Sequence, residues 1–169
     1  MQIDLPYNRA QAVEYARKWA FSRNPAYYDF HGLGGDCTNF VSQCIYAGAG
    51  VMNDTPTFGW YYRSPDDRTP SWTGVPYLYQ FLTTNDSVGP YASEVDASEM
   101  QPGDVIQLGD EDGKFYHTML VVATRRIPSP RTIYIATHTN DAYMRRLSSY
   151  AYAQARFLHI DGVRASETE

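Results

Sequence analysis

The sequence predicts an α+β fold made of a single domain over residues 1–169. Helical spacing of apolar residues marks the N-terminal part, strand patterns follow Pro102, and no repeat or linker divides the chain. Helices followed by strands are typical of the α+β class. With 169 residues, 43% of them hydrophobic, the chain is long enough to bury one core.

The first predicted helix begins after Asn8, a good N-cap, and runs to about Ser22. Residues 24–35, NPAYYDFHGLGG, contain Pro25 and three glycines and therefore form a loop. The helix buries apolar residues at three- and four-residue spacing, namely Ala12, Val13, Ala16, Trp19 and Ala20.

A second helix is predicted after Asp36, which suits the N-cap position, with Gly48 as the C-terminal stop. Cys37 then falls in the first helical turn. The apolar stripe of this helix consists of Phe40, Val41, Cys44 and Ile45.

Residues 50–92 read as a long aromatic loop, with one possible short helix near 75–82. Four strands follow, over residues 104–108, 115–124, 131–139 and 155–160. The separators GDEDGK and RRIPSPR are turn material, so the C-terminal half is expected to form an antiparallel meander.

Composition excludes several classes of function. The net charge of -5 and the lack of a basic run argue against nucleic acid as a partner. No apolar stretch reaches about 18 residues, so we expect no membrane span, and the start MQIDLPYNRA lacks the features of a secretory signal. We expect a monomer without cofactors.

Neither a disulfide nor a metal site is expected. On one helix Cys37 and Cys44 would lie about 10 Å apart along the axis, beyond the roughly 7 Å limit for a bridge. A zinc site of Cys37, His117 and His138 is the main chemical competitor, but the chain has no CxxC or HExxH motif. The DEDG segment at 110–113 is a solvated turn, too short for a calcium loop.

Cys37 is the candidate nucleophile. A thiol attacks a carbonyl as the thiolate, and the start of a helix is expected to lower the pKa of the thiol. The backbone N–H groups of the first helical turn, which have no partner within the helix, can also stabilise an oxyanion. The alternative is an inert thiol beside a glycine turn, and for Cys44, on the apolar stripe, a core role is the simpler interpretation.

His117 is the candidate general base, because a predicted hairpin brings a second histidine opposite it. A turn centred between Ile127 and Pro128 pairs Leu120 with Ile135 and sets His117 against His138. A slip of two residues would bring Asn140 opposite His117, whereas Asp141 has the wrong parity unless a bulge intervenes. The orienting group is therefore expected to be His138, then Asn140, then Asp141.

The two other histidines have simpler interpretations. His31 in a loop and His159 in a late strand are expected to be structural or surface residues.

Several long segments resemble the putative amidase domain family of bacteria over about residues 7–160. They are DCTNFVSQCIYAGAG, GWYYR, SWTGV, QPGDVIQL, HTMLVV and THTNDAYMRRLSSY, in this order. That family is similar to NlpC-type cell-wall peptidases and CHAP domains, so the resemblance implies a papain-like fold in which N-terminal helices pack on an antiparallel sheet.

Motif by motif, the resemblance implies a nucleophile at Cys37, a base at His117 and a polar group at or near His138. It also implies bacterial cell-wall peptide as substrate and a cell-envelope or extracellular location. Asn39 and Phe40 stand where NlpC-type enzymes have glycine and an apolar residue, so the resemblance does not extend to the shape of the pocket.

We therefore expect a cysteine amidohydrolase or peptidase that uses Cys37, His117 and either His138 or Asn140. Acyl transfer is possible with the same residues. The alternative from another class is a binding module for peptide or glycan that uses the same aromatic groove. The residues expected to line the groove are Asp36, Asn39, Tyr28, Trp60 and Trp72.

Overall fold

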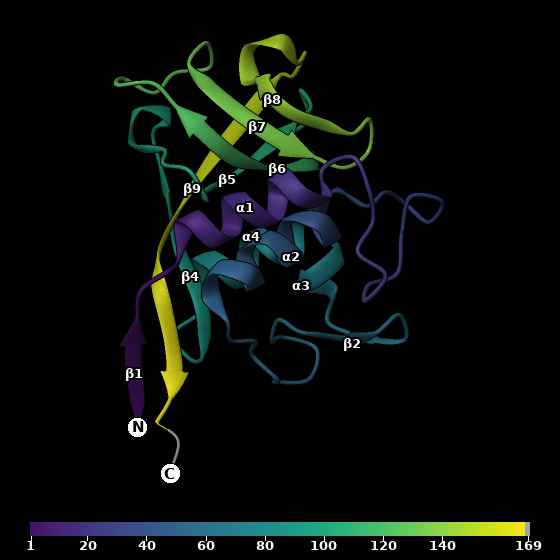
Figure 1. Cartoon of the computed structure of the whole chain (residues 1–169), viewed down its shortest axis with the longest axis vertical. Helices are drawn as coiled ribbons and strands as arrows, with labels where there is room; N and C mark the ends of the chain where they lie inside the picture. Colours follow the sequence, from purple (N-terminus) through teal and green to yellow (C-terminus); the bar gives the residue numbers. More distant parts are fainter. Residues whose placement is uncertain (168–169) are drawn as a thin grey trace.

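The computed structural model describes residues 1–167 and has an α+β fold with an antiparallel sheet (Figure 1). Residues 168–169 of the expected domain lie outside the described part. The helices are α1 (Arg9–Trp19), α2 (Cys37–Ala49), α3 (Pro70–Thr73) and α4 (Val75–Thr84), with short 3₁₀ turns η1 (Ala97–Glu99) and η2 (Leu147–Ser149). No helix within residues 1–167 is long and apolar enough to cross a membrane.

The main sheet has seven strands: β1 (Gln2–Leu5), β4 (Gly89–Val95), β5 (Val105–Gly109), β6 (Phe115–Thr124), β7 (Ile133–Thr137), β8 (Ala142–Arg146) and β9 (Gln154–Ser166). Their order is β1-β9-β5-β6-β7-β8, and β4 also pairs with β9. A separate pair is formed by β2 (Tyr62–Ser64) and β3 (Asp67–Arg68). All pairs are antiparallel.

The predicted meander is correct for β5, β6 and β7 but wrong for the last strand. β9 does not follow β7 in the sheet; it pairs with β1, β4 and β5. β1, β4 and β8 were not predicted. They are short or contain Gly and Pro, and pairing with β9 or β7 holds them in place.

The predicted ends of both long helices need correction. Asn8 does cap α1, accepting a hydrogen bond from the Gln11 amide at 3.1 Å, but α1 ends at Trp19 rather than near Ser22. The C-cap of α2 is Gly50, in the left-handed conformation (φ 70°), and not Gly48. Gly48 lies inside the helix, where a Cβ atom would come within 2.6 Å of the Tyr7 ring.

The helices cover one face of the sheet, with α1 and α2 in front of β6 (Figure 1). Alternate residues of β6 divide between two cores, because successive side chains point to opposite faces. Leu120 and Val122 join the core beneath α1, α2 and α4, whereas Met119 and Val121 join a second core closed by Met100 and Leu147.

A β-bulge sets the register between β6 and β7. The structure pairs Leu120 with Ala136, and Thr124 with Ile133, with a shift between Val121 and Ala123. The predicted Leu120–Ile135 register is therefore wrong by one residue, which turns alternate side chains of β7 to the opposite face. His117 and His138 consequently do not face each other.

Candidate active site

Cys37 is the first residue of α2, and its sulfur lies against β6. The side chain is 7% exposed. Its Sγ is 3.8 Å from the hydroxyl of Thr38 and also accepts a hydrogen bond from the amide of Thr118. The Thr38 and Thr118 hydroxyls are 2.9 Å apart and tie the first turn of α2 to β6. Cys37 is thus held next to Thr118, on the face of β6 that α2 covers.

Burial raises the pKa of the Cys37 thiol. The Thr118 amide and Thr38 act in the opposite direction, and the neighbouring Asp36 carboxylate adds to the rise. The expectation that the helix start lowers this pKa is therefore wrong for this structure, because removal from water outweighs the helix terminus. The thiol is protonated at neutral pH until another group takes its proton.

Asp36 holds the N-cap position of α2, but its side chain makes no capping hydrogen bond. One carboxylate oxygen, Oδ1, accepts from the Phe30 amide and from Asn39 Nδ2, both at 2.9 Å. The other, Oδ2, lies 2.5 Å from Nδ1 of His138. The carboxylate thus connects the loop before α2 to the residues after β7.

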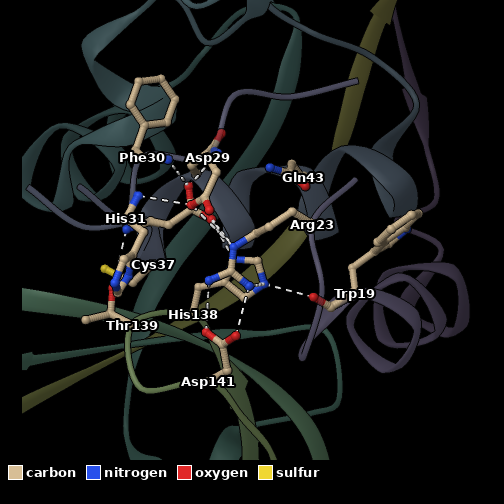
Figure 2. Close-up of polar contacts among 12 residues, drawn as sticks. Trp19, Arg23, Asp29, Phe30, His31, Cys37, Gln43, His138, Thr139 and Asp141 are labelled. Carbon is tan, nitrogen blue, oxygen red and sulfur yellow. Dashed lines mark hydrogen bonds and ion pairs between the residues drawn. The ribbon is translucent and has the colours of Figure 1, made fainter. Parts of the chain in front are cut away.

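His138 is buried in this network and does not orient His117. Its side chain is 1% exposed and stacks on Phe40, with ring centroids 4.0 Å apart. Figure 2 shows Trp19, Arg23 and Asp141 around His138, with the sulfur of Cys37 outside the group. Both ring nitrogens are occupied, so the expected role of His138 beside the base is not compatible with its position.

Both nitrogens of the His138 ring have partners. Nε2 lies 2.8 Å from the Trp19 carbonyl and 3.3 Å from Nη1 of Arg23. Nδ1 lies 2.5 Å from Asp36 Oδ2. The ring therefore connects the end of α1 to the start of α2.

Arg23 completes the network on its outer side. Its guanidinium binds Asp141 with two hydrogen bonds of 2.9 and 3.1 Å. It also lies 3.3 Å from Asp29 and 3.7 Å from Asp36. Asp141 thus serves Arg23 and not the candidate base.

His117 has a different partner from the one predicted. Its Nε2 lies 3.0 Å from the hydroxyl of Thr137, and this hydroxyl also lies 3.0 Å from the Thr118 carbonyl and 2.9 Å from the His138 carbonyl. The single hydroxyl proton of Thr137 can go to one of these carbonyls. The hydroxyl oxygen can then accept a hydrogen bond from Nε2–H of His117, and in this tautomer Nδ1 of His117 is an acceptor. Burial lowers the pKa of His117 to about 4, so the ring is neutral at pH 7.

No hydrogen bond joins Cys37 and His117 in the described structure of residues 1–167. The Thr118 side chain faces Thr38 of α2, whereas His117, the preceding residue of β6, lies on the same face as Met119 and Val121 of the second core. The Thr139 hydroxyl accepts from the Asp36 amide at 3.3 Å.

A hollow of about 350 Å³ opens beside His117. Thr139 and Asn140 form part of its wall, and both adopt left-handed backbone conformations, with φ of 66° and 58°. Such conformations are uncommon for residues other than glycine, above all for a β-branched threonine. Asn140 and His117 thus line the same hollow, but the partner of His117 Nε2 is Thr137 and not Asn140.

The aromatic residues expected to line a groove are mostly core residues. Trp60 and Trp72 are 0% exposed, and their indole N–H groups donate to Ser42 and Asn39. Asn39 is buried too and also donates to the Tyr28 carbonyl. Only Tyr28, which is 45% exposed, presents its ring to solvent. Burial of both tryptophans is not compatible with a binding groove built from them.

The remaining candidates have the structural positions that the sequence favours. His159 binds Asp104 at 2.9 Å, His31 is exposed, and Cys44 is buried among apolar residues. Within residues 1–167, no cluster of three or more His, Cys, Asp or Glu side chains could hold a metal ion.

Sequence reasoning missed Thr137 and Arg23. A threonine at the end of a strand has no distinguishing motif, and its contact with His117 depends on the bulge. Arg23 gave a weak signal, since a lone arginine before a loop that contains Asp29 and Asp36 is a candidate for an ion pair.

Comparison with known proteins identifies the family. The chain is 38% identical over 164 residues to "Uncharacterized protein YhbB" of Bacillus subtilis (strain 168), covering 91% of this chain. It spans about half, 50%, of that relative's length. No solved structure matches. Residues 6–160 match the family described as "Putative amidase domain". The chain therefore belongs to this family, whose description indicates hydrolysis of amide bonds.

Proposed function

We propose that the protein is a cysteine-dependent amidohydrolase in which Cys37 is the nucleophile and His117 the general base. The observation that carries the proposal is the position of the Cys37 sulfur, at the start of α2 and near the amide of Thr118 in β6. The family supports hydrolysis of an amide bond. His117 is neutral at pH 7 and has one free ring nitrogen, as a base requires.

The reaction begins when His117 takes the thiol proton and the sulfur attacks the amide carbonyl. His117 then gives that proton to the leaving amine, and a thioester remains on Cys37. Water, deprotonated by the same imidazole, attacks the thioester and releases the acid and the free thiol. Proton and atoms balance, and no metal or cofactor takes part.

Each neighbouring group has a role in this scheme. The free N–H groups in the first turn of α2 stabilise the oxyanion. Thr137 is a positioning residue, because its hydroxyl fixes the tautomer and angle of His117. Asn140 is a candidate contact for substrate, beside the imidazole.

Attack requires a change from the closed state, since Cys37 is 7% exposed and makes no hydrogen bond with His117 in the described chain. The preceding segment carries Gly34 and Gly35, both at positive φ. Movement at these glycines would open the sulfur to substrate. Because His117 shares a face of β6 with Met119 and Val121, away from α2, its ring must also move to reach the sulfur.

The proposal includes a papain-like arrangement similar to NlpC-type and CHAP domains, and bacterial cell-wall peptide as the class of substrate. It is supported by the antiparallel sheet with helices on one face and by the family. The chain spans only half of that relative's length, so the activity and substrate of the longer protein are part of the proposal.

Incubation with cell-wall peptide fragments, followed by mass spectrometry, tests the activity and identifies the bond. Cleavage adds the mass of one water across each pair of products. Cys37→Ala should abolish cleavage, while Cys44→Ala, at a buried site away from Thr118, should retain it. Cleavage by a folded Cys37→Ala variant at the wild-type rate would exclude Cys37 as the nucleophile.

A further inference from the structure

The hollow beside His117 has a charge unlike that of the chain as a whole. The chain carries a net charge of -5, yet no Asp or Glu lines this hollow, and the charged side chain on its wall is Arg145. Its other wall residues are uncharged, among them Leu108, Tyr116 and Ala151. The hollow is therefore suited to an anionic group.

Arg145 is held in a defined position. Its guanidinium lies 3.9 Å over the Tyr150 ring, and Nε donates to the hydroxyl of Ser149 at 2.7 Å. Nη2 donates to the Ser149 carbonyl at 3.2 Å, and Arg145 also interacts with the hydroxyl of Tyr150. Arg145 is exposed, and a guanidinium packed on an aromatic ring is suited to bind a carboxylate that enters from solvent.

The turn between β7 and β8 supplies a second polar group. Thr139 and Asn140 both have positive φ, as in the tight turn of a β-hairpin, and both line the hollow. The side-chain amide of Asn140 can donate to the same anion as Arg145. The volume of about 350 Å³ is within the usual range for small-molecule sites, roughly 300–1,000 Å³.

The proposed mechanism indicates which part of the substrate lies in the hollow. His117 protonates the leaving amine, so the part of the substrate nearest the imidazole is the amine side. Cys37, which takes the acyl part, does not line the hollow. The hollow therefore lies on the side of the leaving group.

We propose that this hollow binds a leaving amino acid through its free carboxylate, with Arg145 as the main contact and Asn140 as the second. The inference depends on the proposed function for its direction, because His117 must act on the leaving amine. It narrows the substrates to amides whose amine side carries a carboxylate close to the scissile bond.

Two small probes isolate the carboxylate: N-acetylalanine, and N-acetylalaninamide, in which the carboxylate is replaced by a neutral amide. Binding is measured on the full chain as Cys37→Ala, which excludes turnover, by following the ring signals of His117 in NMR titrations. N-acetylalanine should bind about tenfold more tightly than the carboxamide.

Arg145→Gln should remove that difference, and Arg145→Lys should restore part of it. The matched control is Arg146→Gln, since Arg146 contacts Tyr134 and does not line the hollow. Equal affinity of both probes for the parent protein, or an unchanged difference in Arg145→Gln, would overturn the carboxylate site.

Turnover separates this inference from the proposed function. Cell-wall peptide fragments are tested before and after their carboxylates are converted to amides. Wild-type protein should cleave the untreated fragments faster. Equal cleavage of both samples would refute the carboxylate site and leave the hydrolase intact. Cleavage of neither sample, together with carboxylate-dependent binding of the probes, would refute the hydrolase and leave the anion site intact.

Discussion

Replacing His138 by glutamine should lower the free energy of unfolding by about 3 kcal/mol. The imidazole is 1% exposed and lies 2.5 Å from Asp36, so its removal leaves a buried carboxylate oxygen without its nearest partner. Loss of one partner from a buried ion pair typically destabilises a protein by about 3–5 kcal/mol. Asp36 retains the Phe30 amide and Asn39, both at 2.9 Å, which places the expected loss at the lower end.

Urea unfolding measures this loss as a lower midpoint with an unchanged dependence on denaturant. His31→Gln is the control, because His31 lies exposed in a loop and should have no measurable effect. Asp36→Asn should be destabilising as well, and the double variant should lose less than the two single variants together, since they share one interaction. A loss below about 1 kcal/mol for His138→Gln, or strictly additive losses, would refute a stabilising contact between His138 and Asp36.

Three further predictions concern the candidate nucleophile and base. Iodoacetamide should label Cys37 slowly at pH 7 and faster only above pH 9, because burial raises the pKa of its thiol; rapid labelling at pH 7 would contradict this. Burial lowers the pKa of His117 from 6.5 to about 4. Between these pH values the imidazole is protonated in the unfolded chain and neutral in the folded chain. Stability should therefore fall as pH decreases from 6.5 to 4, by up to about 3 kcal/mol, and His117→Gln should lack this part of the loss in urea titrations at each pH. Thr137→Val should lower kcat about tenfold with little change in KM, and Thr137→Ser should restore it; an active valine variant would exclude Thr137 as the positioning residue.

The helices α1 and α2, the strands β5, β6 and β7, and the position of Cys37, the candidate nucleophile, were predictable from the sequence, because local patterns decide them. The apolar spacing of α1 and α2, the glycine-rich loop before Asp36 and the alternation in β5, β6 and β7 are all contained within short windows. These features place Cys37 at the first turn of α2 without knowledge of the tertiary structure.

Partners distant in the chain were not predictable in the same way. β9 pairs with three strands, and nothing in its own residues specifies the place of β5 between β9 and β6. Burial of Trp60 and Trp72 likewise depends on α2 and α4 closing over them. Aromatic residues in a proline- and glycine-rich segment are compatible with a surface groove and with a core, and only packing decides between the two.

The different positions of His117 and His138 follow from the bulge between Val121 and Ala123. Without it the two rings would share a face, as the unbulged register predicts. With it, His138 joins Ala136 on the helix side, where the ring stacks on Phe40 and binds Asp36. Thr137 takes the place beside His117. Because of the bulge, His138 binds Asp36 and helps to fix the start of α2, whereas His117 keeps a ring nitrogen without a partner among the described residues. Because the parity of a whole strand depends on a single extra residue, this division of roles cannot be read from the spacing of the histidines alone.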